Sequence, residues 1–268
     1  MKKFAAAFAA LAIIAGSGAA HAGVVVTEQE VIDQGTGQPL THKRTVMIQG
    51  NKQKMIIDHA QVVVTDLDNG MMYLMNPEKK QYVEMPFPPK GPMAKLMSQG
   101  TLNFKKTGNS KTVSGYACQE YTGVGSKMGN QYSVTGCFST KSPGAKDFDA
   151  FQKIMASKVK GTAMAMQGEV PDGMPMQIDF TTKLTNLSMP KMSPDQAAKL
   201  KQMLTNRPPI VSKTTVTEIT LKDLSADTFK VPVGFTNRRP IGPPEGNSRM
   251  GGGSPAAPAP SPSEKSPE

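Results

Sequence analysis

The only two cysteines of the chain lie on either side of a turn-rich segment, and this placement constrains the fold more than any other feature. Residues 115–121 and 132–138 contain the aromatic and β-branched side chains that are typical of β-strands. Gly125–Asn130 lies between them and contains the glycines and the asparagine that chain reversals favour. The pattern predicts a β-hairpin, which a disulfide between Cys118 and Cys137 would lock.

The register of this hairpin depends on where its turn is placed. A turn centred between Lys127 and Met128 would put Cys118 directly opposite Cys137. Side chains at such positions are close enough to form a disulfide. We therefore predict an intramolecular Cys118–Cys137 bond, with two free thiols as the alternative.

Met1–Ala22 has the features of a secretory signal peptide. Two lysines precede an apolar run over residues 4–15, and small residues lead to a predicted cleavage between Ala22 and Gly23. A membrane-spanning helix is the alternative, but the apolar run is shorter than the roughly 20 residues that such a helix needs. The sequence predicts export to the periplasm, where disulfides form, with no transmembrane anchor in the mature chain.

The distribution of charge argues against a nucleic-acid partner. The net charge is +10 for the whole chain, and removal of the two signal-peptide lysines lowers it to +8. The basic residues are spread along the chain, whereas nucleic-acid binding needs them clustered and interleaved with aromatic residues. A basic surface suits anionic lipid headgroups, although a solvated exterior is the simpler explanation.

The rest of the chain divides into one domain and a tail. Residues 237–268 are rich in proline, glycine and serine and contain no aromatic residue. Such a segment cannot bury a core, so we predict a disordered tail that could tether or dock an envelope protein partner. Residues 23–236 have a length that suits a single β-rich domain.

The first half of this domain is predicted to be a series of strands joined by tight turns. Gly50-Asn51 and Asn69-Gly70 are favoured in two-residue hairpins, and Asn76–Lys79 has the pattern of a type I turn. The predicted strands cover residues 23–32, 41–49, 52–57, 61–67, 71–75 and 81–85.

These turns also predict the register of the strands. Val46 is expected opposite Met55, and Tyr73 is expected to face Tyr82. Consecutive strands joined by tight reversals form an antiparallel meander, and a long sheet of this kind twists strongly.

Helical spacing appears in the second half of the domain. Phe148, Phe151, Ile154 and Met155 recur on one side of residues 147–159, which predicts an amphipathic helix lying on the sheet. The other predicted elements are a short helix at residues 93–98, a helix with a capping box beginning at residue 193, and strands at 101–106, 111–113, 174–187 and 210–221.

Three short motifs, 76–82, 115–121 and 229–235, together resemble an exported bacterial family of unknown function, which is itself similar to the LolA/LolB-like lipoprotein-carrier and sorting fold. The resemblance implies a mainly β fold, a curved antiparallel half-barrel sheet with helices covering its concave face. In the carriers that face holds lipoprotein acyl chains. The cysteine pair belongs to the unknown-function family and not to the carriers proper.

A search for catalytic chemistry gives no candidate residue. After cleavage only His42 and His59 remain as histidines, and the nucleophile elbow, the zinc-protease motif and the phosphate loop are all absent from the sequence. Asp66–Gly70 has the composition of a calcium loop, but Pro77 occupies the position of the bidentate glutamate, so a hairpin turn is the better interpretation. We predict no enzyme, no cofactor and no metal site.

Methionine is unusually abundant, with 19 residues. Its flexible thioether suits an irregular core or an adaptable apolar pocket, and soft thioethers also suit copper(I). The methionine pairs behind the copper(I) alternative have no histidine or cysteine beside them and are Met164 with Met166, Met174 with Met176, and Met189 with Met192.

The hypothesis favoured by these observations is a periplasmic protein that binds a lipid or a lipoprotein acyl chain between the curved sheet and its helices. Phe148, Phe151, Ile154 and Met155 are the predicted ligand contacts. A structural or partner-binding envelope protein and a copper(I) binder are the alternatives.

Overall fold

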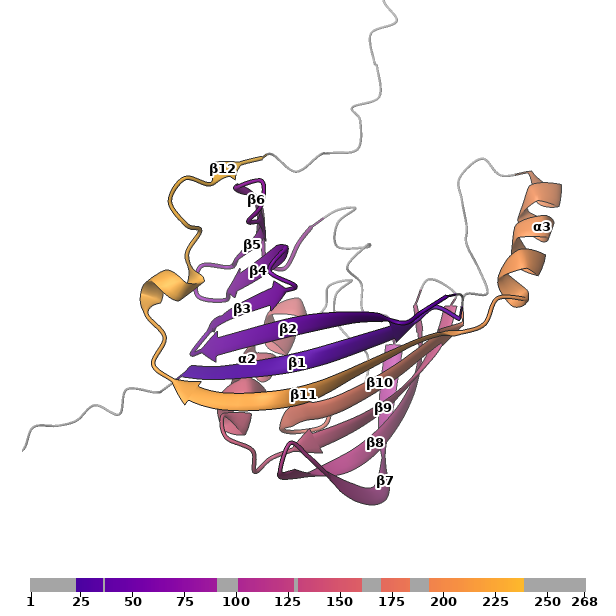
Figure 1. The fold of residues 1–268 in the computed structure, drawn as a ribbon, viewed down its shortest axis with the longest axis horizontal. Coiled ribbons are helices and arrows are strands. Elements are labelled where there is room, and N and C mark those ends of the chain that lie inside the picture. Colours follow the sequence, from indigo (N-terminus) through magenta and orange to yellow (C-terminus); the bar gives the residue numbers. More distant parts are fainter. Residues whose placement is uncertain are drawn as a thin grey trace, which may run out of the picture.

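Twelve strands form one continuous sheet in the residues that the structure describes (Figure 1). This computed structural model describes residues 23–35, 37–90, 101–127, 130–160, 170–183 and 193–238. The strand order is β12-β6-β5-β4-β3-β2-β1-β11-β10-β9-β8-β7. The predicted signal peptide, the predicted helix at 93–98 and residues 239–268 of the predicted tail lie outside the described residues.

The strands are β1 (Gly23–Asp33), β2 (Leu40–Gln49), β3 (Lys52–Ile57), β4 (Gln61–Asp66), β5 (Met71–Asn76), β6 (Gln81–Pro86), β7 (Thr101–Val113), β8 (Tyr116–Lys127), β9 (Asn130–Ser139), β10 (Met174–Lys183), β11 (Ile210–Lys222) and β12 (Thr236–Asn237). The helices are α2 (Ala145–Val159), α3 (Pro194–Thr205) and the 3-10 helix η1 (Ala226–Phe229).

Strands β2 to β6 form the predicted five-strand meander, each antiparallel to the next, and β1 extends it by pairing antiparallel with β2. Val46 lies opposite Met55, as the two-residue turn at Gly50-Asn51 requires. Gly50 has a φ of +56°, a left-handed conformation that glycine adopts without steric cost. The residues of the turn therefore determine the register in which β2 pairs with β3.

The predicted pairing of Tyr73 with Tyr82 was wrong by two residues. Tyr73 lies opposite Glu84 and Tyr82 lies opposite Met75, because the connection between β5 and β6 contains four residues, 77–80. A shift of two positions keeps every side chain on its own face of the sheet. The two tyrosine rings therefore still lie close, with centroids 6.4 Å apart.

The disulfide hairpin is confirmed, but in a different register. Cys118 and Cys137 are bonded to each other, whereas the residue directly opposite Cys137 is Glu120. The predicted turn lay too early in the chain, because β8 continues to Lys127, which pairs with Asn130. Since side chains alternate with a period of two, the cysteines remain on one face as diagonal neighbours, with Cα atoms 5.4 Å apart.

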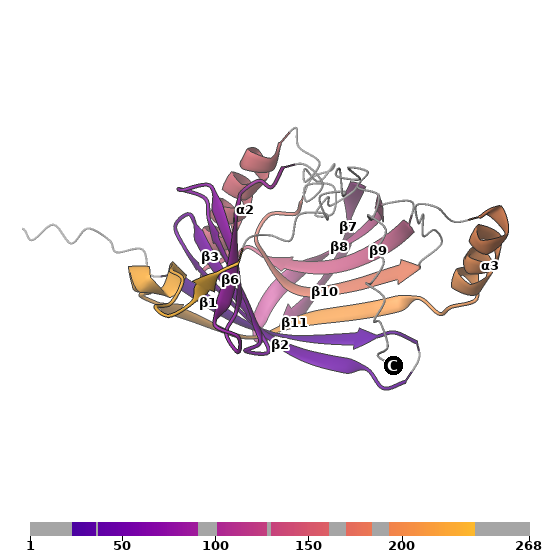
Figure 2. The ribbon, with the colours of Figure 1, turned by 90° about the horizontal axis from the view of Figure 1, so that it is seen from above.

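Strand β11 joins the two parts of the sheet. It pairs antiparallel with β1 on one side and with β10 on the other, so the last long strand of the chain lies in the middle of the sheet. Beyond it the sheet curls, and the turn between β7 and β8 bends back toward β11. There the Ser114 hydroxyl donates a hydrogen bond to the Val216 carbonyl oxygen, 2.5 Å away. The sheet is therefore strongly curved (Figure 2).

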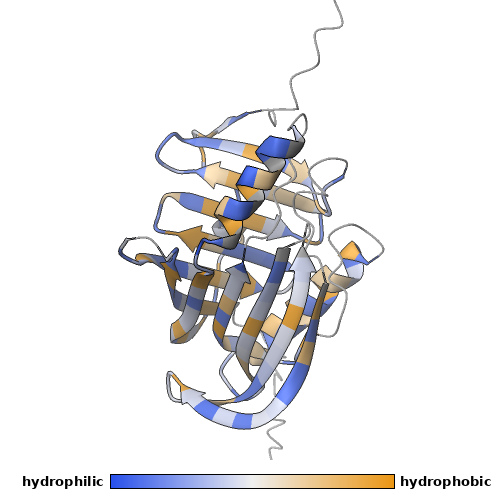
Figure 3. Cartoon of the chain, turned by 90° about the vertical axis from the view of Figure 1, so that its right-hand side faces the viewer, coloured by the Kyte–Doolittle hydropathy of each residue, from blue (hydrophilic) through white to orange (hydrophobic). Residues whose placement is uncertain are grey.

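The main core lies between this curved sheet and α2, which packs against β1, β2 and β10. Hydrophobic and hydrophilic residues alternate along the strands, as Figure 3 shows. Helix α3 lies beyond the ends of β10 and β11, away from α2 (Figures 1 and 2). The predicted fold class, a curved antiparallel half-barrel, is confirmed. Neither α-helix of the described residues is long and apolar enough to cross a membrane.

A second, smaller core lies on the opposite face of the meander. Val62, Val64 and Met75 are buried there against Phe229 of η1. The segment after η1 then pairs with the edge of the sheet through β12, which runs parallel to β6. The C-terminal part of the domain thus covers a face that strand alternation alone would leave to solvent.

Asp66 organises the turn between β4 and β5. Its carboxylate accepts hydrogen bonds from the backbone N–H groups of Asp68 (3.0 Å) and Asn69 (3.1 Å) and from the Asn69 side chain (2.9 Å). Lys52 Nζ lies 2.9 Å from the same carboxylate. Burial acts to raise the pKa of Asp66, but the bonds from Lys52 and Asn69 outweigh it and hold this pKa below its ordinary value. The Asp66 carboxylate therefore stabilises the hairpin turn between β4 and β5.

We expect the Asp66→Ala variant to lose about 1–3 kcal/mol of unfolding free energy at neutral pH, because charge-assisted hydrogen bonds are lost. Since the pKa of Asp66 is lower in the folded protein, its contribution is present above the unfolded pKa and is lost as pH falls below about 4. The difference between wild type and variant should therefore shrink in acid. Urea unfolding at several pH values measures it, with the exposed Asp223→Ala as control. A difference that does not change with pH would contradict this account.

Candidate functional site

A cavity of about 320 Å³ lies between α2 and the concave face of the sheet. Its walls come from β1, β2, β3, α2, β10 and β11, elements that are far apart in the sequence. The volume is at the lower end of the roughly 300–1,000 Å³ that is usual for small-molecule sites. The apolar lining consists mainly of Val46, Met55, Phe148, Met176, Ile178 and Val216.

Strand alternation explains why these side chains meet. Val46 and Met55 lie opposite each other on β2 and β3 and therefore point to the same face. Val216 of β11 is brought beside them because β11 pairs with β1. Phe148 reaches the cavity from α2, so the helix forms one wall and the sheet the other.

One end of the cavity is polar and charged. Glu28 and Arg44 lie opposite each other on β1 and β2, and both line the cavity. Arg44 Nε lies 3.5 Å from Glu28 Oε2, and Arg44 Nη1 lies 3.7 Å from Glu30 Oε2. Both distances exceed the roughly 2.7–2.9 Å of a charge-assisted hydrogen bond. The guanidinium is therefore shared loosely between two carboxylates.

Glu28 is only 7% exposed. Burial raises the pKa of Glu28, the positive charge of Arg44 opposes this rise, and the neighbouring Glu30 adds to it. A carboxyl group in such surroundings accepts a proton more readily than one on the surface. The cavity lining therefore contains a carboxyl group, that of Glu28, whose protonation depends on the groups that lie beside it.

The four predicted ligand contacts occupy different places. Phe148 lines the cavity. Phe151 is fully buried in the main core, and Ile154 and Met155 pack against that core while partly exposed. The structure therefore brings all four to the side of α2 that faces the sheet, and of these four only Phe148 is part of the cavity lining.

Sequence reasoning missed Glu28 and Arg44. A usable signal was present, because Val24, Val26 and Glu28 share one face of β1 and the first two are core residues. A charged residue at a position where alternation predicts a buried side chain needs a partner or a function.

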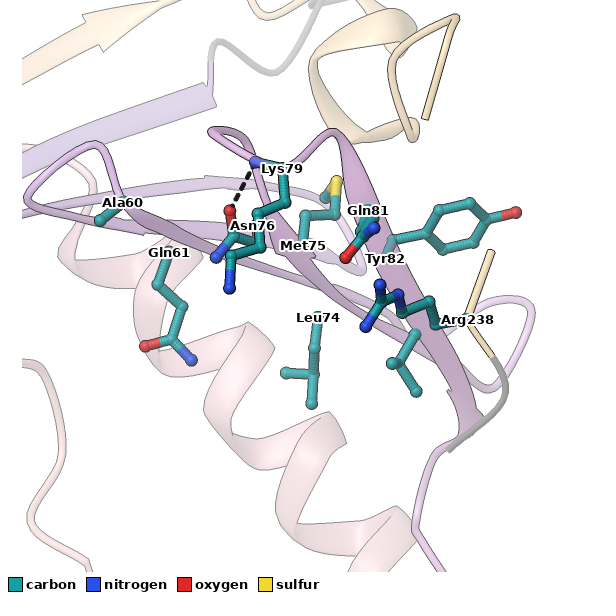
Figure 4. Close-up of a pocket in the computed structure, with 10 residues that line it drawn as sticks. Ala60, Gln61, Leu74, Met75, Asn76, Lys79, Gln81, Tyr82 and Arg238 are labelled. Atoms are coloured by element: carbon teal, nitrogen blue, oxygen red, sulfur yellow. Dashed lines mark hydrogen bonds between the residues drawn. The ribbon is translucent and has the colours of Figure 1, made fainter. Parts of the chain in front are cut away.

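A larger groove of about 460 Å³ lies where β5 ends and β4 and β6 begin (Figure 4). Leu74 and Tyr82 contribute to it, together with the cationic side chains of Lys79 and Arg238. Lys79 is fixed by its backbone N–H, which donates to the Asn76 side chain at 2.9 Å. We rank this groove below the cavity because its cations lie on the surface and are exposed.

The two histidines in the part of the chain that the structure describes, His42 and His59, lie apart from the cavity lining. His42 bonds to Asp58 at the ends of β2 and β3, and the exposed His59 occupies the adjacent turn with a φ of +59°. No group of three or more His, Cys, Asp or Glu side chains within the described residues is arranged to hold a metal ion.

Methionine positions bear on the copper(I) alternative. Met174 and Met176 are both fully buried in the main core, where their side chains fill space between sheet and helix. The pairs at 164 and 166 and at 189 and 192 lie outside the described residues. For the pair that can be placed, core filling is the better-supported role.

Comparison with known proteins gives a family and distant structural neighbours. A family model described as "Domain of unknown function (DUF4412)" matches residues 40–235. No curated protein matches the sequence.

Among solved structures, PNGF-II is 10% identical with a TM-score of 0.40, over 82% of this chain and 31% of PNGF-II, so this chain spans about a third of that protein. A LolA superfamily protein from Nitrosomonas europaea is 9% identical with a TM-score of 0.29, over 78% of this chain and 90% of that one. A DUF1329 family protein from Desulfovibrio piger is 8% identical with a TM-score of 0.31, over 78% and 90%.

Proposed function

Because the chain belongs to the family described as domain of unknown function DUF4412, which names no activity, we propose its function from the cavity itself. The protein is a non-enzymatic periplasmic protein that binds an apolar ligand, a lipid or a lipoprotein acyl chain, between the curved sheet and α2. The observation that carries this proposal is the cavity of about 320 Å³, in which seven of the twelve lining residues are apolar and come from both sheet and helix.

The lining is suited to chains of varied shape. Met55 and Met176 contribute flexible thioethers, which adapt to different apolar surfaces. The branched side chains of Val46, Ile178 and Val216 form the firmer part of the wall. A site of this kind selects for apolarity and length more than for detailed shape.

Helix α2 is the movable wall in this proposal. The polar contacts of α2 with the rest of the fold include the ion pair from Lys153 to Asp172 (3.0 Å), which lies on the surface and stabilises little, and a long hydrogen bond that the Gly173 N–H donates to Asp149 Oδ1 (3.4 Å). The buried side of α2 is held against the sheet chiefly by apolar packing, and such packing is not directional. A small displacement of α2 would therefore admit a chain without breaking strong bonds.

We expect single-chain lipids to displace a fluorescent fatty-acid probe from the protein, with affinity rising about fourfold per added methylene until the cavity is full. This corresponds to about 0.8 kcal/mol per buried methylene. The measurement is a competition series with fatty acids and monoacylglycerols of increasing length.

The variant Thr214→Phe should weaken binding at every chain length, because Thr214 lines the cavity and a larger ring there occupies it. Thr220→Phe is the matched control, since Thr220 lies exposed on the same strand, β11. If affinity did not depend on chain length, or if both variants lost the same affinity, the lipid-binding proposal would be wrong. A structural or partner-binding envelope protein would then be the remaining hypothesis.

A further inference from the structure

The charged end of the cavity contains two buried polar atoms without a hydrogen-bond partner. They are Glu28 Oε2 and Arg44 Nε, which lie 3.5 Å apart. A buried polar group without a hydrogen-bond partner is destabilising, so native proteins contain few of them. Two such atoms side by side in the lining of one cavity need an explanation.

The neighbouring polar atoms are better satisfied. Glu30 Oε1 accepts a hydrogen bond from the Ser212 hydroxyl at 2.8 Å, and Arg44 Nη2 contacts the Met55 sulfur at 3.5 Å. Glu28 Oε2 and Arg44 Nε therefore have hydrogen-bonding capacity that these contacts do not use.

The chemistry of the two atoms limits what that group can be. Arg44 Nε–H is a donor and needs an acceptor, while the Glu28 carboxylate is an acceptor and needs a donor. An ammonium group offers nothing to the arginine, and a carboxylate is repelled by Glu28 and Glu30. A hydroxyl or an amide both donates and accepts, and it adds no charge to the buried cluster.

We infer that the Glu28–Arg44 pair binds the uncharged hydroxyl or amide group of an amphiphile whose apolar chain occupies the rest of the cavity. This inference rests on the proposed function and specifies the class of its ligand. Glu28 and Arg44 place the polar group at the sheet end of the cavity, and Phe148 and Met176 contact the chain.

The test compares four competitors of equal chain length, a fatty alcohol, a primary fatty amide, a fatty acid and an alkylamine, in displacement of a neutral fluorescent lipid probe at neutral pH. The alcohol and the amide should bind about tenfold or more tightly than the acid and the amine, as expected when two buried groups gain partners.

Variants then assign this preference to the pair. Glu28→Leu and Arg44→Met should each reduce the preference to within about threefold while affinity still rises with chain length. Lys43→Met is the matched control, because Lys43 is exposed next to Arg44 on β2 and is not part of the cavity lining, and it should keep the preference.

The outcomes separate the two proposals. Equal affinity for all four headgroups in the wild type, with dependence on chain length retained, overturns the headgroup inference and leaves lipid binding standing. Tighter binding of the acid or the amine overturns it as well. Failure of every competitor and of the probe to bind overturns both, and the wild-type series decides this even where a variant does not fold.

Discussion

Replacement of Phe151 with alanine is expected to lower the free energy of unfolding by about 3–5 kcal/mol. Phe151 is 0% exposed and belongs to the core between α2 and the sheet. Truncation removes buried apolar surface and leaves a cavity that close-packed neighbours fill only in part. Chemical denaturation followed by circular dichroism measures the loss.

Lys158→Ala is the control for this experiment, because Lys158 lies exposed on the same helix and should change stability by less than about 0.5 kcal/mol. Phe151→Leu should fall between the two. A loss below about 1 kcal/mol for Phe151→Ala would show that α2 is not anchored through this residue. Phe151→Asp would place an unpaired carboxylate in the core and unfold the protein, so it cannot serve as a test of ligand binding.

Reduction of the Cys118–Cys137 disulfide is expected to cost roughly 3 kcal/mol of unfolding free energy. The bond joins residues separated by 19 positions, and closing a loop of that size restricts the unfolded chain by this amount in the entropy model. The melting temperature should fall while the β content stays, because the hairpin keeps its backbone pairing. Thermal unfolding with and without reductant measures the effect.

The double variant Cys118→Ala/Cys137→Ala separates the crosslink from packing. Both cysteines are buried, so the variant should lose somewhat more stability than reduction alone, which keeps the side-chain volume. The native protein should contain no thiol that reacts with an alkylating reagent. Two reactive thiols in the native protein would contradict the account.

Local patterns were sufficient for most of the secondary structure. The predicted strand at 52–57 and the helix at 147–159 agree with the observed β3 and α2 closely, since alternation and helical spacing are properties of each segment alone. The capping box at Ser193 is present in α3 for the same reason. The two register errors were both shifts of two residues, which leave every side chain on its predicted face.

The site was predicted less completely. The apolar side of α2 was recognised, but that pattern cannot distinguish Phe148, which reaches the cavity, from Phe151, which completes the core. The two residues are three positions apart, which is less than one helical turn, so both lie on the same side of α2. How deeply each side chain is buried is decided by the strands on which it packs. Glu28 and Arg44 were not predicted as site residues, because charged residues are dispersed along the chain and sequence spacing gives no reason to choose these two.

The sequence by itself determined the hairpin with its disulfide, the five-strand meander over residues 41–85 and the amphipathic side of α2, because each depends on spacing and turn chemistry within a short segment. Only the tertiary structure decided that β11 lies between β1 and β10, and with it the meeting of Glu28, Arg44, Phe148 and Val216 around one cavity. The pairing of β1 with β11 joins residues that are nearly two hundred positions apart in the sequence. No local pattern encodes such a contact, because its free energy comes from the burial of surfaces that the chain brings together only when the whole sheet forms.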